Sequence, residues 1–322
     1  MKMRNIFVLL LVLAVAFPVF ARGAQDGSTR PQVFSLATAG LGGTYYIVGA
    51  GLAEAITQRV GPLTVNAIIA PGSAGNPLML DRHEAELGIT NYFSGSNAIH
   101  GRPPFEHRIP IAGIAPLQFS TLHIMVMANR TDLRTFADLR GARVNLGPAG
   151  GGGATFFNEL LPFWGLSPSD FNFSYLSYTE GTDALRDGRI DVNTPNGAFP
   201  LETVSSIAAF DNIRLISLEA ENMARVHAAN PYYNIAPIPG GTYRGIDETV
   251  YTGGIQDILI VRQDMDEELA YQITRAIYEA LAEIRLVHPS VSHMSFDNYN
   301  HSLVPLHPGA LRFYRERGIP IQ

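Results

Sequence analysis

The chain has 322 residues, of which 46% are hydrophobic and 16% are charged, and its formal net charge is −6 at pH 7. This composition excludes a disordered chain, and the length is sufficient for two ordinary domains with a sizeable core. The acidic balance removes the electrostatic basis for binding nucleic acid. Because the chain has no cysteine, disulfides, thiolate metal sites and cysteine nucleophiles are excluded as well.

The N-terminus has the pattern of a secretory signal peptide. Two basic residues precede an apolar run over 6–20, and small residues follow it. The run is shorter than the ~20 apolar residues that span a bilayer, which argues against the alternative of a membrane anchor. We expect residues 1–24 to be removed, with cleavage after Ala21 or Ala24, leaving a soluble exported protein. Its 21 Lys and Arg against 29 Asp and Glu would give a net charge of about −8, or −9 if Arg22 is also lost.

After a polar tether, short apolar runs alternate with helical patterns, which is typical of βαβ units and mostly parallel sheets. Helical patterns lie between most of the predicted strands. The predicted strands are Val33–Thr38, Thr64–Ile69, Leu87–Thr90, Ile111–Ala115, His123–Met127, Ala142–Leu146, Phe173–Tyr178, Ile190–Asn193, Ile213–Leu218 and Gln256–Val261.

Two helices have the clearest patterns. The first starts after Thr44 and places apolar residues at i, i+3, i+4, i+7 and i+11, which predicts a helix that packs on a sheet. The second begins with Asp264 and Glu267 in capping-box spacing and must stop before Pro289. We expect the second helix to be the longest in the chain.

Two segments, 80–87 and 185–192, resemble each other. Both have the pattern of a helix end, a tight polar turn and an acidic residue within a short strand, and Asn91 and Asn196 follow at equivalent places. A single match of this kind could arise by chance. It nevertheless suits a protein of two similar α/β lobes that point the C-terminal ends of their strands at a shared cleft.

Three loops rich in glycine or small residues, 39–46, 71–77 and 147–155, each follow a predicted strand and precede a helix. Backbone N–H groups and the positive end of a helix bind anions at such places without a cationic side chain. The alternative for each loop is structural, because glycines are common in these turns and Thr44 and Asn76 can be simple N-caps. Three such loops on one chain favour a site for a carboxylate.

The residues expected to bind the ligand supply backbone donors, neutral polar contacts and apolar walls. They are Gly43, Thr44, Tyr45, Ser73, Asn76, Asn91, Gly152, Gly153, Thr155, Asn196 and Phe199. None of the three loops contains an arginine, so we expect affinity to depend on backbone donors and helix dipoles and not on a bidentate clamp.

Common enzyme and metal motifs are not found in the sequence. The glycines at 150–153 lack the Lys-Ser/Thr of a P-loop, and there is no Gly-x-Ser-x-Gly elbow. The closest histidine pairs, His288/His293 and His301/His307, lack the i, i+4 spacing of a helical zinc site. We therefore expect no metal, no cofactor and no enzymatic activity, and a secreted enzyme on the same scaffold is the alternative.

Five stretches together resemble the TAXI-type solute-binding proteins of TRAP transporters. They cover nearly the whole chain after the N-terminal segment, and they are Thr38–Gly49, Leu139–Pro148, Ala184–Asp191, Ile238–Gly245 and Pro305–Ala310. The resemblance implies an α/β fold of the type II periplasmic-binding class. In this fold two α/β lobes are joined by two crossing strands, with the ligand cleft between them.

The resemblance also implies an extracytoplasmic subunit that closes on its solute and delivers it to an ion-gradient-driven membrane permease, with no ATPase. Small organic acids or amino acids such as glutamate and glutamine are the usual solutes. The crossings would lie near 122–127 and 258–261, which makes lobe one 31–121 plus 259–322 and lobe two 122–258. A receptor of an ATP-driven uptake system, with the same fold and binding, is the alternative.

The chain departs from the pattern of this family at three places. After Gly147-Pro148 the family usually shows Gly-Ser-Gly-Thr, but here four glycines precede Ala154-Thr155, so that a hydroxyl donor is missing or displaced. The usual Gln after the second acidic strand is replaced by the Asn91 region. The usual Gly-His-Pro after the equivalent strand of lobe two is Gly197-Ala198-Phe199-Pro200. These differences concern the identity of the solute and not the fold.

Overall fold

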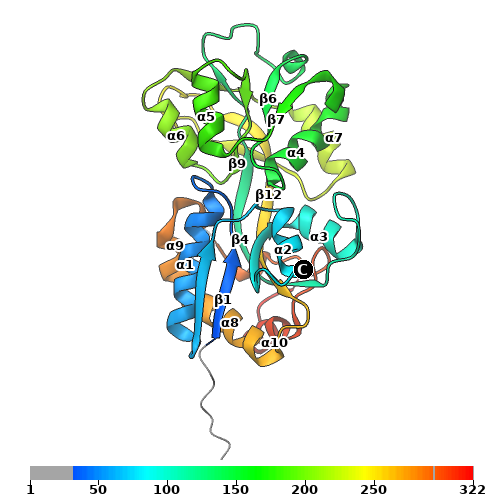
Figure 1. Cartoon of the computed structure of the whole chain (residues 1–322), viewed down its shortest axis with the longest axis vertical. Coiled ribbons are helices and arrows are strands. Elements are labelled where there is room, and N and C mark those ends of the chain that lie inside the picture. The colour runs from blue at the N-terminus through cyan, green and yellow to red at the C-terminus, as the bar shows by residue number, and fades with distance from the viewer. Residues whose placement is uncertain (1–31, 293, 322) are drawn as a thin grey trace, which may run out of the picture. The chain divides into compact units, whose positions relative to one another are not determined.

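The computed structural model describes residues 32–292 and 294–321, so the predicted signal peptide at 1–24 lies outside the described residues. The described chain forms two α/β lobes, each built around its own sheet (Figure 1). None of the helices in these residues has the length and hydropathy to cross a membrane.

The first sheet has the strand order β2-β1-β3-β12-β4-β9, and β11 also pairs with β12. Strand β1 is parallel to β2 and β3, whereas β12 is antiparallel to β3 and β4. The strands are β1 (Gln32–Ala37), β2 (Leu63–Ile68), β3 (Leu87–Asn91), β4 (Ile111–Leu122), β9 (Asn196–Gly197), β11 (Asn234–Ile238) and β12 (Val250–Arg262).

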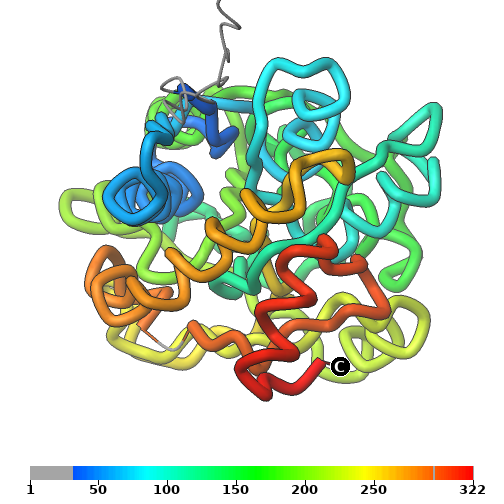
Figure 2. Tube along the Cα trace, turned by 90° about the horizontal axis from the view of Figure 1, so that it is seen from below, coloured from blue at the N-terminus to red at the C-terminus, as the bar shows by residue number. Residues whose placement is uncertain are grey.

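Six helices accompany the first sheet, and α8 and α10 among them lie side by side (Figure 2). They are α1 (Thr44–Arg59), α2 (Gly75–Asp81), α3 (Tyr92–His100), α8 (Glu267–Glu279), α9 (Leu281–Val287) and α10 (Pro308–Arg317). Two short 3-10 helices, η4 (Pro289–Val291) and η5 (Phe296–Asn298), connect α9 to the C-terminal segment.

The second sheet has the strand order β10-β5-β8-β6-β7. Its strands are β5 (Met125–Met127), β6 (Arg143–Asn145), β7 (Asn172–Ser174), β8 (Val192–Asn193) and β10 (Ile213–Leu215). The helices around it are α4 (Gly152–Leu160), α5 (Tyr178–Arg186), α6 (Glu202–Ala208), α7 (Ala220–Ala229) and the 3-10 helices η1 (Ala137–Leu139), η2 (Leu161–Trp164) and η3 (Pro168–Asp170).

Each of the predicted strands overlaps a strand of the structure, and β9 and β11 were not predicted. The largest differences are in the two strands that connect the lobes (Figure 1): β4 continues past Ala115 to Leu122, and β12 begins at Val250 instead of Gln256. A proline within a strand pattern normally indicates a break. Here Pro116 lies beside an irregularity of the β4–β12 ladder, where a missing N–H donor is tolerated.

The predicted helix at the first glycine loop is confirmed, but the expected longest helix is divided. The N-cap of α8 is Asp266, whose side chain accepts a hydrogen bond from the Leu269 amide, so the expectation for Asp264 was wrong. Helix α8 ends at Glu279 because Ala280 leaves the helical conformation, and α9 follows. With 16 residues, α1 is longer than α8 with 13.

The acidic residues of the two similar segments have the same structural role in the two lobes. The Glu86 carboxylate accepts a hydrogen bond from the Ser35 amide at 2.8 Å, and the Asp191 carboxylate accepts one from the Arg143 amide at 2.9 Å. In both cases the acid directly precedes a strand, β3 or β8, and accepts an amide of the neighbouring parallel strand, β1 or β6. This equivalence supports the predicted relation between the lobes.

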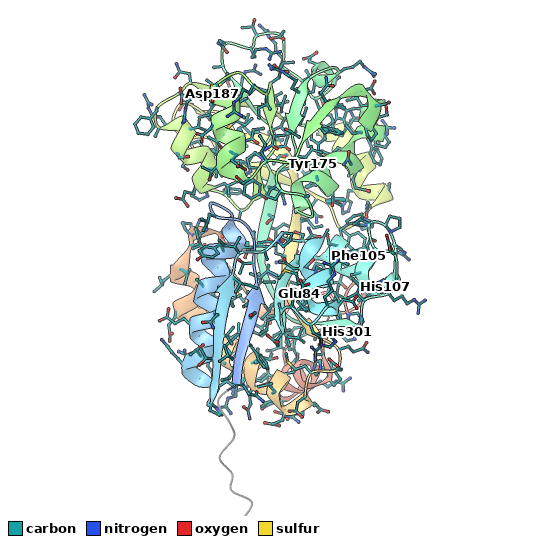
Figure 3. The ribbon with its side chains drawn as sticks, in the orientation of Figure 1. Glu84, Phe105, His107, Tyr175, Asp187 and His301 are labelled. Atoms are coloured by element: carbon teal, nitrogen blue, oxygen red, sulfur yellow. The ribbon has the colours of Figure 1, made fainter. Side chains whose placement is uncertain are left out.

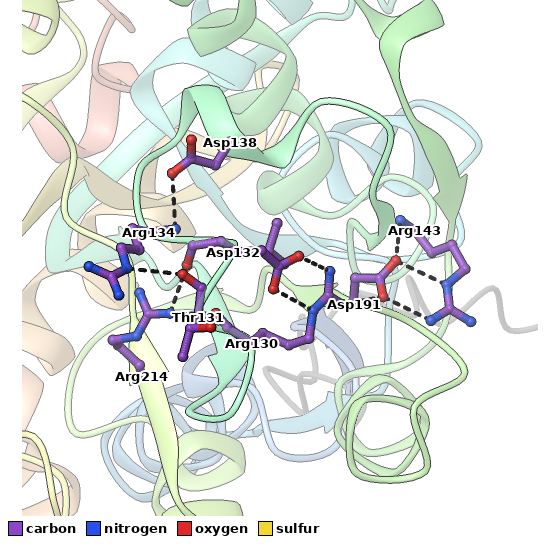
Figure 4. A network of polar contacts seen from close by, with 9 residues as sticks. Arg130, Thr131, Asp132, Arg134, Asp138, Arg143, Asp191 and Arg214 are labelled. Carbon is purple, nitrogen blue, oxygen red and sulfur yellow. Dashed lines mark hydrogen bonds and ion pairs between the residues drawn. The ribbon is translucent and has the colours of Figure 1, made fainter.

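Asp191 is also at the centre of an ionic network that ties β6 to the end of β5 (Figure 4). Arg143 donates to both of its carboxylate oxygens, and Arg130 donates to one of them. These bonds, chiefly those from Arg143, hold the pKa of Asp191 well below its usual range.

We expect Asp191→Asn to lower the free energy of unfolding at pH 7 by about 1 kcal/mol, because the Arg143 amide and the partly exposed guanidinium groups of Arg143 and Arg130 lose a charged acceptor. The pKa of Asp191 is lower in the folded protein than in the unfolded chain. Asp191 therefore stabilises the fold at pH values above its unfolded pKa, and this stabilisation is lost as the pH falls below that value. The difference between wild type and variant should therefore shrink below pH 4. Denaturant unfolding at pH 3 and pH 7 measures it, with the exposed Asp132→Asn as a control expected to have little effect. A difference that is independent of pH would contradict this account.

Candidate functional site

A pocket lies between the two lobes, at the C-terminal ends of strands from both sheets. Its cavity volume in this structure is about 10 Å³, which is room for about one water molecule. None of the described residues that line it carries a charge. The lining residues are Ala39, Gly40, Gly43, Thr44, Tyr45, Pro71, Gly72, Ser73, Pro148, Gly152, Tyr178 and Asn196.

The N-termini of two helices, α1 and α4, border this pocket. Their N-caps, Gly43 and Gly151, are extended glycines that provide no side-chain cap, and neither helix has an acidic residue in its first turn. Among the other helices, α3, α5, α8 and α10 are each capped by a side chain, and α6, α7 and α9 lack such a cap but have an acidic residue in the first turn. The first N–H groups of α1 and α4 therefore remain available as donors, and both helix dipoles place positive charge at the pocket.

The two helix N-termini occupy equivalent places in the two lobes. The residue after β1, Thr38, donates its amide to the carbonyl of Ile68 on the neighbouring strand, and Leu146 after β6 donates to Ser174 in the same way. Each glycine loop then leads into its helix. The internal repeat thus directs two uncapped helix ends toward one pocket.

Neutral polar side chains converge on the first turn of α4. A Cβ atom placed on Gly152 would lie 2.9 Å from Ser73 Oγ, 2.9 Å from Asn196 Nδ2 and 3.4 Å from Asn91 Nδ2. The other end of the Asn196 amide, Oδ1, is buried and has no hydrogen-bond partner among the described residues. An unsatisfied buried acceptor costs about 1–3 kcal/mol, so Asn196 Oδ1 can accept a hydrogen bond from a water or from a bound solute.

Six of the predicted site residues line the pocket, and the others lie next to it or have other roles. Gly43, Thr44, Tyr45, Ser73, Gly152 and Asn196 line it, and Asn76, Asn91, Gly153, Thr155 and Phe199 do not. Asn91 caps α3 through Ser94, although its amide is near Gly152. Phe199 is only partly buried, against the core around α6.

Asn76 has a structural role that the sequence pattern did not reveal. Its side-chain amide donates to the carbonyls of Ala37, Thr38 and Ile89, and its oxygen accepts from the Gly72 amide. The side chain is completely buried, and these bonds fix α2 to β1 and β3. The Asn76 amide is therefore fully used within the first lobe.

The second glycine loop contacts the third. The amides of Ala74 and Gly75 at the start of α2 donate to the carbonyl of Gly150 at 3.0 and 3.1 Å. Gly150 has a φ of +82°, a conformation that side chains other than glycine rarely adopt. The four-glycine run thus places a carbonyl of the second lobe on the N-terminus of α2, so α1 and α4 are the helix ends left for a solute.

A buried carboxyl group, Asp257 of β12, lies behind the pocket and was missed by sequence reasoning. Its Oδ1 accepts a hydrogen bond from Tyr45 at 2.5 Å, and its Oδ2 accepts from Ser120 at 2.5 Å and Gln118 at 3.0 Å. Burial raises its pKa to about 8, although these hydrogen bonds oppose the shift. The signal in the sequence was a single acid within the apolar run Ile255–Val261.

The histidines of the closest sequence pairs are used by the backbone. His288, His301 and His307 each accept a hydrogen bond at Nδ1 from an amide a few residues later. His301 lies well away from the boundary between the lobes (Figure 3), and His293 lies outside the described residues. Among the described residues, no group of three potential ligands is arranged to hold a metal.

Comparisons with known proteins agree with this geometry. The sequence model of the NMT1-like family matches residues 36–318. Among solved structures, the alkanesulfonate-binding protein SsuA from Xanthomonas axonopodis pv. citri bound to MOPS has a TM-score of 0.50 at 15% identity, and the match covers 90% of this chain and 81% of that protein.

Two further structures show the same architecture. A putative L-cystine ABC transporter from Listeria monocytogenes gives a TM-score of 0.51 at 12% identity, with 81% of this chain and 97% of that chain covered. An ancestral arginine-binding protein bound to arginine gives 0.52 at 12% identity, with 81% and 98% covered. At these identities the likeness shows the fold alone, which is the two-lobed, type II-like fold of periplasmic binding proteins.

Proposed function

Since the chain belongs to the NMT1-like family and has a periplasmic-binding fold, we propose that it is an exported solute-binding subunit of a membrane transporter. It captures a small carboxylate-bearing solute between its lobes and delivers it to a permease. The observation that carries this proposal is the pair of uncapped helix N-termini, α1 and α4, at one pocket without charged side chains. Residues 31–121 plus 259–322 are proposed as lobe one and 122–258 as lobe two.

The solute's carboxylate is proposed to bind the first amides of the two helices, at Thr44–Tyr45 and Gly152–Thr155. The Gly43 amide donates to the Gly40 carbonyl within the loop. Each helix N-terminus stabilises a negative charge by about 0.3–1 kcal/mol, and by up to about 2 kcal/mol where water is partly excluded. Ser73 adds a hydroxyl group from the first lobe, whereas the Thr44 hydroxyl is paired with the backbone of Ala198. Because Asn196 Oδ1 has no partner in the described residues, a solute that also carries an N–H or O–H donor fits best. Amino acids such as glutamate and glutamine meet both requirements.

Binding without chemistry is favoured over a secreted enzyme. The described lining residues include no histidine or carboxylate that could act as a general acid or base, and Asp257 lies behind Tyr45. A solute recovered after denaturing the purified protein is therefore expected to be chemically unchanged.

The transporter partner is proposed from the resemblance to the TAXI family, which favours a TRAP permease driven by an ion gradient. One of the similar structures is named as part of an ABC transporter, so an ATP-driven system is the second candidate. Uptake into vesicles that contain the permease separates the two. Uptake that needs an ion gradient but no ATP supports the TRAP assignment, and strict ATP dependence would overturn it.

Calorimetric titration tests the binding proposal. The purified protein without residues 1–24 is titrated with L-glutamate, L-glutamine and succinate, and with glucose and adenine as neutral controls. We expect saturable heat with one site per chain from at least one carboxylate and none from the controls. Heat from glucose or adenine alone would contradict the proposal.

A further inference from the structure

Asp257 is at the end of a short chain of hydrogen bonds that reaches the pocket. The hydroxyl of Tyr45 is 2.5 Å from Asp257 Oδ1 and 2.9 Å from Ser73 Oγ. Both Tyr45 and Ser73 line the pocket, whereas Asp257 is completely buried behind them. The chain Asp257–Tyr45–Ser73 therefore connects a titratable group to the place where a solute would bind.

The direction of this chain depends on a single proton, because each hydroxyl has only one hydrogen to donate. When Asp257 is ionised, Tyr45 donates to the carboxylate and Ser73 donates to the Tyr45 oxygen. Ser73 Oγ can then only accept a hydrogen bond from the pocket. When Asp257 carries a proton on Oδ1, it donates to Tyr45, Tyr45 donates to Ser73, and the Ser73 hydroxyl is free to donate into the pocket.

The position of the proton follows from the contacts of the two carboxyl oxygens. Oδ2 already accepts hydrogen bonds from Ser120 and Gln118, whereas Oδ1 has Tyr45 as its single hydrogen-bond partner in the described chain. We place the added proton on Oδ1, the oxygen with fewer hydrogen bonds to accept, where it reverses the bond to Tyr45. The change is one O–H bond formed with a proton from the solvent, and no other covalent bond is altered.

We propose that the proton on Asp257 sets the direction of this hydrogen-bond chain and so determines whether Ser73 offers a donor or an acceptor to the solute. Asp257 is then a positioning residue that does not touch the solute. The inference rests on the proposed function, since it concerns the same pocket. The protonated form suits a carboxylate, which can only accept, and binding of an anion thus favours uptake of a proton.

The surroundings of Asp257 support a neutral state. The titratable groups that face it are Tyr45 from α1 and Tyr178 from α5, and burial raises the pKa of both, that of Tyr178 to about 12. No cation contacts the carboxyl group in the described residues. The other neighbours, from β3, β4 and the second glycine loop, are neutral: Asn91, Gln118, Ser120 and Ser73. With a pKa of about 8, Asp257 is mostly protonated at pH 7.

Infrared spectroscopy tests the protonation without any solute. The wild-type spectrum at pH 7 should contain the absorption of a protonated carboxyl group that is missing from Asp257→Asn, and this difference should disappear above pH 9. A difference spectrum that shows an ionised carboxylate at pH 7 would overturn the proposal. This result does not depend on binding, so it separates the inference from the proposed function.

Calorimetry with succinate tests the link to binding, because succinate does not itself titrate between pH 7 and pH 9. If the protonated form alone binds, a pKa of about 8 makes the wild-type affinity roughly tenfold weaker at pH 9 than at pH 7. At pH 8, titrations in buffers of different ionisation enthalpy should show uptake of about half a proton. Equal affinity at the two pH values would overturn the proposal. If no carboxylate binds, the proposed function fails, and the infrared result still decides the protonation.

Variants of Tyr45 and Ser73 distinguish a role of Asp257 in orienting the hydrogen bonds from a general effect on the structure. Tyr45→Phe interrupts the chain and should make the succinate affinity independent of pH, whereas the control Tyr92→Phe, whose hydroxyl accepts from Asn300 away from the pocket, should keep the dependence. Ser73→Ala removes the terminal donor and should weaken binding about tenfold at pH 7 but little at pH 9. A succinate affinity that still depends on pH in Tyr45→Phe would contradict the proposed chain of hydrogen bonds.

Discussion

Gly152→Val is expected to weaken solute binding by at least about 100-fold while the chain still folds. The first β-carbon at this position would lie 2.9 Å from both Ser73 Oγ and Asn196 Nδ2, so it occupies the point where the polar groups of the pocket converge. Valine adds two further methyl groups. The lobes must then separate, or Ser73 and Asn196 must turn away, and either change removes contacts with the solute. Helical backbone at the start of α4 accommodates a side chain, so the loss is local.

Calorimetry with whichever carboxylate binds wild type measures this loss, and the midpoint of thermal unfolding checks the fold. Gly61→Ala is the matched control, because a β-carbon there meets no atom within 4 Å and its affinity should be unchanged. Asn196→Ala is a milder second variant that removes the unpartnered carbonyl, with an expected loss of about tenfold. Wild-type affinity in both Gly152→Val and Asn196→Ala would place the solute elsewhere.

The second large effect concerns the dependence of stability on pH. The folded pKa of Asp257 is about 8, far above the value of about 3.9 in an unfolded chain. The protonated Asp257 contributes fully to stability at pH values below its unfolded pKa. This contribution is lost as the pH rises toward 8, because the carboxyl group releases its proton at a lower pH in the unfolded chain than in the folded protein. Between pH 5 and pH 7, wild type should lose about 1.4 kcal/mol per pH unit relative to Asp257→Asn.

Denaturant unfolding of both proteins at pH 5, 6, 7 and 8 gives this difference. An amide cannot ionise, but its oxygen can accept from Ser120 while its NH2 group donates to the Tyr45 oxygen. Asp257→Asn should therefore gain stability relative to wild type as the pH rises. The exposed Asp132→Asn should instead follow the wild-type curve. Parallel curves for wild type and Asp257→Asn would mean that the buried carboxyl group is already ionised in the folded protein.

Local sequence patterns were sufficient for most of the fold. Apolar runs placed the strands of both sheets, and the stripe after Thr44 placed α1, because burial of one face repeats at the period of each element. The resemblance of 80–87 to 185–192 also had a physical basis, since Glu86 and Asp191 accept equivalent backbone amides. The continuation of β4 past Pro116 was not predicted, because a proline is tolerated there only through the irregular ladder between β4 and β12.

The candidate site was predicted only where local structure determines it. A glycine loop that leads into a helix exposes backbone donors, and the loops before α1 and α4 were identified on that basis. The role of Asp257 depends on Tyr45, which is 212 positions away in the sequence. The hydrogen bonds from the N-terminus of α2 to the carbonyl of Gly150 likewise depend on how the lobes meet. Periodicity and composition contain no information about such long-range contacts.

The most direct test of the central claim is a crystal structure of the protein with the carboxylate that calorimetry selects. We predict that the carboxylate lies between the N-termini of α1 and α4, within hydrogen-bond distance of the amides of Thr44–Tyr45 and Gly152–Thr155, with a second polar group of the solute at Asn196. A carboxylate bound to an arginine or lysine side chain, or a solute outside the space between the lobes, would contradict the account.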